Sequence, residues 1–295
     1  MIDWSFFSAR CGLYGLQPQS APDWESWSSG YHAQVSFRTG RKWRHSIRAV
    51  GRLDAAHKAA KGILDALYEP PPSVHGFVRK RSTLTGAQPH VGAELVLSID
   101  LKRFYAQVDY ERVERLVQSH LDPEVAAWIQ GCCFVSGALP FGFRTSPVLS
   151  NIAFQSTDDS IQDLANRRGV AYTRWVDDLT FSGGSTDDAF LEELTGLLSK
   201  EGWHINDAKT RFMRRSPYVL GLYVGKSIDE PHLPRWMKRR LLLESHYFAK
   251  FGDAHFHHPG VLSRNRLFGL AAYARSIEPD FARRIDELIT KGLTR

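Results

Sequence analysis

Residues 169–183, with the sequence GVAYTRWVDDLTFSG, constrain the fold more than any other segment of this 295-residue chain. Two runs of strand-forming residues flank the adjacent carboxylates of Asp177 and Asp178. This pattern predicts a β-hairpin with both carboxylates at its tip. Because like charges a few ångströms apart raise each other's pKa, burying such a pair among apolar residues is unfavourable. A bound cation would remove that penalty.

A third carboxylate ends another predicted strand. The apolar run AELVLSID, residues 93–100, has the length of a buried strand and closes with Asp100. Oxygen ligands without a neighbouring His or Cys favour a hard ion, Mg²⁺ or alternatively Mn²⁺. Two such ions about 3.5–4 Å apart stabilise the attacking and the leaving oxygen in phosphoryl transfer. Because side chains alternate along a strand, we assign Asp177 as the bridging ligand that aligns with Asp100, and Asp178 as the auxiliary one.

The remaining periodicities predict an α+β protein with an antiparallel sheet. Residues 226–295 predict only helices, each with an apolar stripe opposite Arg and Lys. The other expected elements are a helix that ends before Pro70–Pro72, a helix near 110–130, a helix with Ser146 as its N-cap and Pro147 as its first residue that ends at Gly169, a helix within 187–203, and strands at 205–212 and 218–225.

Charge is divided unevenly along the chain. Residues 38–81 carry 11 basic and 3 acidic side chains, and residues 82–225 carry 13 basic and 18 acidic ones. The last stretch, residues 226–295, has a net charge of +5. An acidic centre between basic flanks suits a cation site held between two surfaces that bind a phosphate backbone. Ordinary solvated helix faces are the alternative explanation.

Cysteine content and hydropathy predict a cytoplasmic protein without a membrane anchor. Cys11, Cys132 and Cys133 have neither the spacing of metal ligands nor that of a disulfide framework. No apolar run approaches the roughly 20 residues that span a bilayer. The first ten residues also do not have the charged and apolar regions of a signal peptide.

Five segments together resemble the sequence motifs of reverse transcriptases, in the order and spacing of that family and over about residues 85–225. They are SIDLKRFYAQV, ALPFGFRTSPVLSNI, YTRWVDDLTFSG, GWHINDAKT and VLGLYVG. The segment HGFVRKRSTLTGAQPHVGA resembles an element upstream of the first motif in bacterial retron-type enzymes, particularly at Ala87 and His90. Within the family, the closest likeness is therefore to bacterial retron-type reverse transcriptases.

The resemblance implies the right-hand polymerase fold, with fingers, a palm that contains the antiparallel sheet, and a helical thumb. Residues 1–90 would form an N-terminal segment and fingers. Residues 91–225 would form the palm with interleaved fingers elements, and residues 226–295 the thumb. It further implies that the three aspartates hold two metal ions and that Lys209 assists catalysis.

The resemblance also implies contacts with the incoming nucleotide. The candidates are Arg41, Arg44, Leu101, Tyr105, Phe141 and Gly142. Tyr105 would crowd the 2′ position of the sugar, with core packing as its alternative role. Each arginine would meet the triphosphate or remain a surface charge. Gly142 would let the nucleotide approach the backbone, or would make a turn.

The sequence departs from the family pattern at four places. Phe141 stands where the second motif usually has glutamine, and Trp175–Val176 precede the aspartate pair in place of Tyr or Phe and a small residue. Leu220 replaces the threonine of the retron V-T-G triplet, and Gly86 replaces an asparagine. No metal ligand is lost, so we expect the polymerase chemistry to survive.

These observations predict an RNA-directed DNA polymerase that uses deoxynucleoside triphosphates and Mg²⁺. A structured noncoding RNA would serve as template and primer, in antiviral defence, with an effector protein as a further partner. One alternative is a defence-associated or abortive-infection reverse transcriptase that makes unusual or untemplated DNA, which the departures at Phe141 and Trp175 favour. A polymerase-shaped RNA-binding subunit without activity is the other alternative, against which the intact triad argues.

Overall fold

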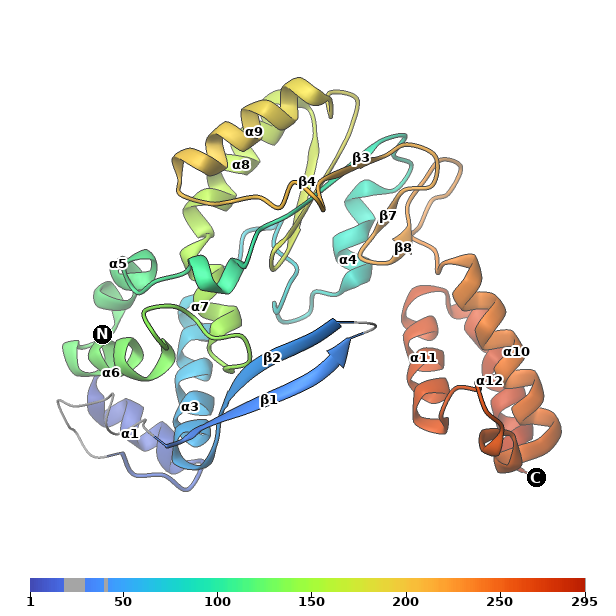
Figure 1. The fold of residues 1–295 in the computed structure, drawn as a ribbon, viewed down its shortest axis with the longest axis horizontal. Helices are drawn as coiled ribbons and strands as arrows, with labels where there is room; N and C mark the ends of the chain where they lie inside the picture. The colour runs from blue at the N-terminus through green and yellow to red at the C-terminus, as the bar shows by residue number, and fades with distance from the viewer. Residues whose placement is uncertain (19–29, 40–41, 295) are drawn as a thin grey trace.

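The computed structural model describes residues 1–18, 30–39 and 42–294. The chain forms three parts: a sheet with helices, a long two-stranded hairpin with helices, and a bundle of helices (Figure 1). This is the α+β, right-hand arrangement of palm, fingers and thumb that the resemblance implies. None of the helices that the structure describes has the length and apolar character needed to cross a bilayer.

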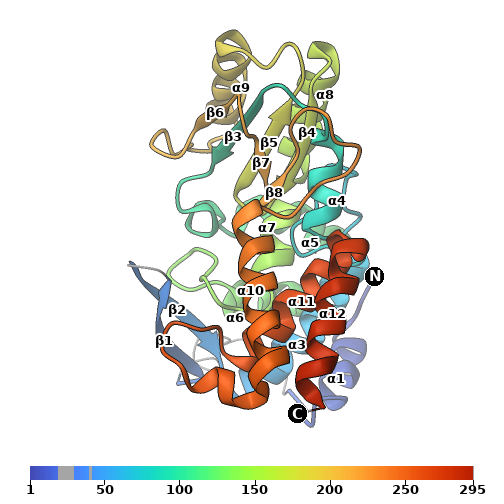
Figure 2. The same cartoon turned by 90° about the vertical axis from the view of Figure 1, so that its right-hand side faces the viewer.

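The palm contains a four-stranded antiparallel sheet in the order β4-β5-β3-β6. Its strands are β3 (Val96–Asp100), β4 (Ala171–Trp175), β5 (Asp178–Ser182) and β6 (Arg211–Met213). Two helices, α8 (Gln155–Arg168) and α9 (Asp188–Lys200), lie along one side of this sheet (Figures 1 and 2). Strands β4 and β5 form the predicted hairpin, which is therefore confirmed.

Both long helices expected in the middle of the chain are interrupted. The region near 110–130 forms α5 (Glu111–His120) and α6 (Pro123–Cys133), because Asp122 accepts hydrogen bonds from the amides that begin α6. The helix expected up to Gly169 is divided at Phe154 into α7 (Ser146–Ala153) and α8. Gly169 ends α8 in the left-handed conformation, with φ of 64°, as predicted.

The expected cap at Ser146 is wrong by one residue. Thr145 occupies the N-cap position of α7, and Ser146 is already helical. The Ser146 hydroxyl donates instead to the carbonyl of Pro140, at 2.7 Å. This bond ties the start of α7 to the preceding loop, which also carries Phe141 and Gly142.

The last two expected strands are shorter than predicted. Residues 205–210 form a turn, and only β6 follows it as a strand. Residues 218–225 form a small hairpin of β7 (Tyr218–Val219) and β8 (Leu222–Tyr223) in place of one strand. Its two turn residues, Leu220 and Gly221, have φ of 51° and 82°, the signs that a tight two-residue hairpin turn requires.

The fingers combine a hairpin with the N-terminal helices. Strands β1 (His32–Thr39) and β2 (Lys42–Ala49) pair along their whole length. Behind them lie α1 (Trp4–Gly12) and α3 (Gly51–Leu67), the helix predicted before the prolines. Short elements then lead into the palm: α4 (Thr83–Ala87), η1 (Gln88–His90) and, after β3, η2 (Phe104–Gln107).

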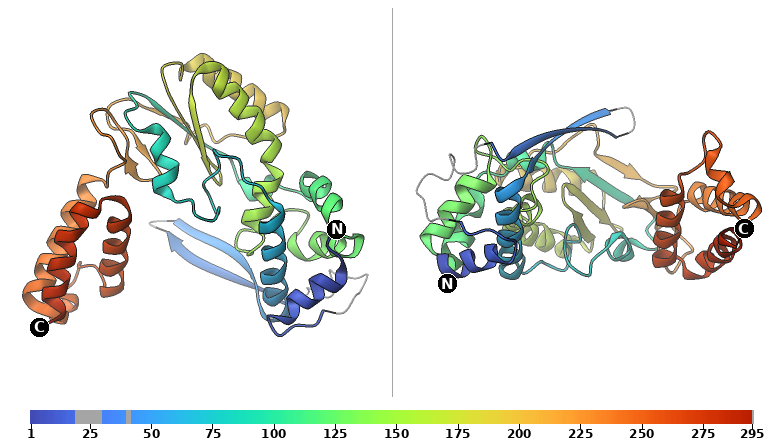
Figure 3. Two further views of the ribbon diagram at one scale, coloured as in Figure 1. Left: turned by 180° about the vertical axis from the view of Figure 1, so that it is seen from behind. Right: turned by 90° about the horizontal axis from the view of Figure 1, so that it is seen from below.

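The thumb is helical, as predicted. It consists of α10 (Arg235–Phe251), η3 (Gly252–His257), α11 (Arg264–Ile277) and α12 (Pro279–Leu293). Its apolar core continues into β7, β8 and the start of β3. Seen from the front and from below, the bundle stands apart from the fingers hairpin, and the palm lies between the two (Figures 1 and 3).

Candidate functional site

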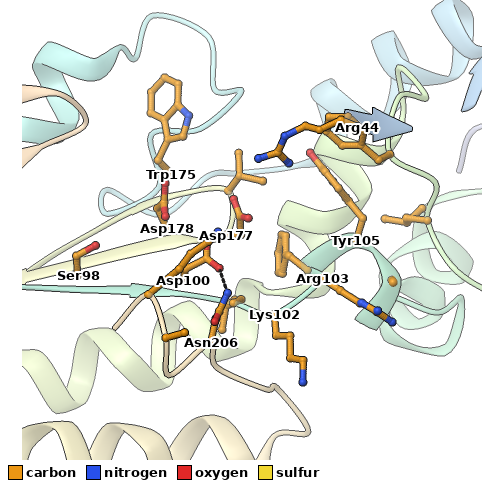
Figure 4. A pocket seen from close by; sticks show the side chains of 18 of the residues that line it. Arg44, Ser98, Asp100, Lys102, Arg103, Tyr105, Trp175, Asp177, Asp178 and Asn206 are labelled. Carbon is orange, nitrogen blue, oxygen red and sulfur yellow. Dashed lines mark hydrogen bonds and ion pairs between the residues drawn. The ribbon is translucent and has the colours of Figure 1, made fainter. Parts of the chain in front are cut away.

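The three predicted carboxylates meet in one cleft of about 1040 Å³ between palm and fingers. Asp100 ends β3, Asp178 begins β5, and Asp177 lies in the turn between β4 and β5. The strand ladder places Asp178 directly opposite Asp100, and the Leu101 amide donates to the Asp177 carbonyl at 2.9 Å. Asp100, Asp177 and Asp178 lie close together, with Arg44 and Tyr105 across from them (Figure 4). The register thus aligns Asp178 with Asp100, while Asp177 lies in the turn, so strand alternation does not support the alignment of Asp177; the separate roles of the two carboxylates stay predictions.

Both carboxylate oxygens of Asp100 have partners in this structure. Lys209 Nζ lies 2.6 Å from Oδ2, and Asn206 Nδ2 donates to Oδ1 at 3.0 Å. The backbone N–H of Asn206 also donates to the backbone carbonyl of Asp100, at 2.8 Å. The structure thus brings Lys209 to the site and adds Asn206, a residue that sequence reasoning missed although it stands three residues before the lysine in the same turn.

Electrostatics at the hairpin tip favour a bound cation. Burial, followed by the charges of Asp177 and Asp100, raises the pKa of Asp178 to about 6. Burial and the charge of Asp100 also raise the pKa of Asp177. Among the described residues, no three His, Cys, Asp or Glu side chains are grouped closely enough to hold a metal ion as they stand. The donor set nevertheless fits a hard cation, since it consists of oxygens only, and such an ion would replace the Lys209 ammonium at Asp100.

Most of the predicted nucleotide contacts line the same cleft. Arg44, Leu101, Tyr105 and Phe141 all do so, whereas Arg41 lies outside the described residues. Arg44 belongs to strand β2 of the fingers hairpin. The rings of Tyr105 and Phe141 have centroids 6.1 Å apart. Burial, and then the charge of Asp177, raises the pKa of the Tyr105 hydroxyl, which stays protonated.

Gly142 has a role in the docking of the fingers hairpin. Its φ is 120°, and a Cβ there would lie 2.2 Å from Ser46 Oγ and 2.6 Å from the carbonyl oxygen of Ile47. Next to it, the Ile47 amide donates to the Phe141 carbonyl at 2.9 Å. The missing side chain therefore lets β2 pack directly on the loop before α7. This contact leaves the predicted approach of a nucleotide untested.

The aspartate hairpin is held by residues to which sequence reasoning assigned no structural role. Arg174 of β4 forms a fully buried ion pair with Asp158 of α8, with Nη2 and Oδ2 2.6 Å apart. His90, singled out only for its likeness to retron enzymes, is buried and hydrogen-bonds with Ser182 and Thr173 on the two strands, at 2.7 and 2.8 Å. Burial lowers its pKa to about 3, so its ring is neutral and structural at physiological pH.

Comparison with known proteins agrees with this geometry. Residues 39–224 match the family described as "Reverse transcriptase (RNA-dependent DNA polymerase)". The Retron Mx65 reverse transcriptase of Myxococcus xanthus is 33% identical over 265 residues, which cover 79% of this chain and 58% of that protein. The Retron Ec86 reverse transcriptase of Escherichia coli is 34% identical over 171 residues, which cover 56% of this chain and 53% of that protein.

A solved structure also aligns with most of the chain. The foamy viral protease-reverse transcriptase in complex with double-stranded DNA gives a TM-score of 0.48 at 15% identity, covering 89% of this chain and 44% of that one.

The chain spans between half and three fifths of the length of the two retron proteins just named. Its family match nevertheless extends from the second strand of the fingers hairpin, β2, through the carboxylate cleft to β8. The chain therefore belongs to the reverse transcriptase family, among its bacterial retron-type members.

Proposed function

We propose that this protein is an RNA-directed DNA polymerase that uses deoxynucleoside triphosphates and two Mg²⁺ ions, with Mn²⁺ as an alternative. The observation that supports this most is the convergence of Asp100, Asp177 and Asp178 on one cleft beside Lys209. The aspartates would hold the ions. When bound, the ions supply charge stabilisation for the attacking and leaving oxygens of phosphoryl transfer.

Lys209 would act on the leaving group. Its side chain is 56% exposed to the cleft while its ammonium contacts Asp100, so it can reach a phosphate group when that contact is exchanged. There it would donate a proton to pyrophosphate or stabilise its negative charge. Lys209→Ala should then lower kcat much more than it weakens nucleotide binding, and an unchanged rate of the chemical step would remove this role.

The exposed face of α10 suits a nucleic-acid backbone. Arg235, Trp236 and Arg239 are exposed at the end of the helix nearest the palm, and Tyr247 and Phe251 continue the exposed aromatics along it. Basic and aromatic side chains together bind phosphates and stack on bases. Two neighbouring basic residues of α10 already form ion pairs within the thumb: Lys238 pairs with Glu278, and Arg240 pairs with Glu244. We therefore assign backbone contacts to Arg235 and Arg239.

A second cleft, of about 700 Å³, offers a path for single-stranded template. Lys61, Arg79 and Phe77 are among its lining residues. Phe77 is 62% exposed and also lines the carboxylate cleft, so the two clefts meet at its ring. An exposed ring with cations nearby is a surface on which an unpaired base stacks.

The partners would follow from the likeness to retron enzymes. We infer a structured noncoding RNA as template and primer, an effector protein, a cytoplasmic location and a role in antiviral defence. One structural observation supports the alternative in which the enzyme makes untemplated DNA. Phe141, 46% exposed in the cleft, presents a ring where the family usually has glutamine.

Sequencing the nucleic acid that co-purifies with the full chain, with and without RNase or DNase treatment, tests this proposal. We expect one RNA species together with DNA complementary to part of it. DNA without a complement in the bound RNA would favour the untemplated alternative. RNA without any DNA would favour the inactive RNA-binding subunit.

A further inference from the structure

The backbone turn that carries Asp177 is strained. Val176 has φ of 60°, a left-handed conformation in which a β-branched residue is an outlier. The loop at Gly76 packs closely on this turn, since a Cβ on Gly76 would lie 2.7 Å from the Val176 amide nitrogen. A strained residue persists only where its surroundings hold it in place.

One buried side chain holds this turn from beneath. Arg174 Nη1 donates to the Val176 carbonyl at 3.0 Å, one residue before Asp177. The same nitrogen donates to Asn151 Oδ1 of α7, also at 3.0 Å. Asn151 in turn donates to the carbonyl of Gly76 at 3.1 Å, so the strained turn and the loop packed against it share one hydrogen-bonded anchor.

The guanidinium itself is fixed by Asp158. Its Nε and Nη2 donate to the two carboxylate oxygens at 2.8 and 2.6 Å, and neither side chain is exposed. Tyr172 donates to the same carboxylate at 2.7 Å. Asn151 comes from α7 and Asp158 from α8, which packs against the strand that carries Arg174.

This arrangement does more than stabilise the fold. A buried ion pair offsets its own desolvation only with excellent geometry, and apolar residues of similar size are often as stable. The planar fork of arginine, however, binds a carboxylate with two nitrogens and leaves the third for other acceptors, which a lysine cannot do. Here the third nitrogen reaches the turn that carries the catalytic carboxylates.

We propose that Arg174, fixed by Asp158, is a positioning residue that sets where Asp177 and Asp178 stand for ion binding. This inference rests on the proposed two-metal function. It predicts that replacing the Arg174 guanidinium lowers the affinity of the site for its ions, while the fold and the distant α10 face stay intact. Changes behind the ligands of a metal site typically reduce its affinity or activity by about 10- to 100-fold.

The test compares Arg174→Lys with Arg168→Lys in the full chain. Arg168 makes a similar two-nitrogen contact with Glu193, at 3.1 and 2.7 Å, but on the partly exposed side of the palm. Mn²⁺ binding is measured directly by electron paramagnetic resonance, and single-nucleotide incorporation is measured over a range of Mn²⁺ concentrations. Circular dichroism and RNA binding report on folding.

For Arg174→Lys we expect the dissociation constant of Mn²⁺ to rise about tenfold or more and kcat to fall, with nucleotide KM little changed. High Mn²⁺ should restore part of the rate. Arg168→Lys should bind Mn²⁺ as the parent does. A folded Arg174→Lys protein with parental Mn²⁺ affinity and kcat would overturn the inference.

A second variant covers the case in which Arg174→Lys does not fold. Asn151→Ala leaves the ion pair in place and removes the side chain that links Arg174 Nη1 to the Gly76 loop, so it is judged by the same change in Mn²⁺ affinity. A parent protein that neither binds Mn²⁺ nor incorporates nucleotides would instead contradict the proposed function itself.

Discussion

Gly142→Ala should separate the fingers from the palm without disturbing the carboxylates. The new Cβ would lie 2.6 Å from the Ile47 carbonyl oxygen, whereas ordinary contacts begin at 3.4 Å, so β2 must move by about 0.8 Å. A shift of that size would stretch the 2.9 Å hydrogen bond from the Ile47 amide to Phe141 beyond useful length. Arg44, on the same strand, would move away from the cleft.

The expected magnitudes follow from these contacts. Losing one charged hydrogen bond from Arg44 to a nucleotide phosphate costs about 1.5–3 kcal/mol, so the nucleotide KM should rise about tenfold or more. The positive φ adds about 1–3 kcal/mol of strain to the folded state. Gly137→Ala is the matched control, since Gly137 has φ of 78° but no atom within 4 Å of its would-be Cβ.

Steady-state incorporation of a single nucleotide, with thermal unfolding of both variants, measures the two effects separately. Both variants place alanine at a positive φ, but Gly142→Ala should lose more stability than Gly137→Ala, because only its new Cβ collides with β2. Only Gly142→Ala should raise KM. If its KM stays within about twofold of the Gly137→Ala value, the docking of β2 does not set nucleotide binding and the reasoning is refuted.

Three further predictions concern the cleft and the thumb. Because the pKa of Asp178 is raised to about 6 and ions bind the deprotonated form, Mn²⁺ affinity should be constant above about pH 7 and fall roughly tenfold by pH 5; a flat profile would contradict this. Tyr105→Ala should increase ribonucleotide incorporation in a competition assay while Tyr105→Phe should not, since the ring excludes the 2′-hydroxyl; equal selectivity in all three proteins would make Tyr105 a packing residue. Replacing Arg235 and Arg239 with Gln should flatten the salt dependence of RNA binding, measured by filter retention, by about one unit of slope for each lost phosphate contact, and an unchanged slope would place the RNA elsewhere.

Local patterns predicted the parts of the site that depend on neighbouring residues. The alternation around Asp177–Asp178 predicted the hairpin, and the apolar run before Asp100 predicted β3, because strand pairing buries such runs. Asp122–Pro123 also marked a helix start that could have been recognised, since aspartate caps and proline suits the first turn. The division at Phe154 has no comparable signal in the sequence.

Partners that meet only in the folded protein could not be predicted in the same way. Arg174 occupies a strand position that pattern alone would allow to face solvent, and Asp158 lies in a helix rich in polar residues. Their pairing depends on how α8 packs behind β4. Gly142 likewise has the sequence of a turn, while its contact with β2 arises from the docking of a hairpin about a hundred residues away in the chain.

The most direct test of the central claim is primer extension on an RNA template in Mg²⁺, with the template base next to the primer varied and one nucleotide supplied at a time. The account predicts that the parent protein adds only the complementary deoxynucleotide. Asp100→Asn and Asp177→Asn should add none while still binding the template. Addition that ignores the template base, or comparable synthesis by either variant, would contradict an RNA-directed polymerase built on these carboxylates.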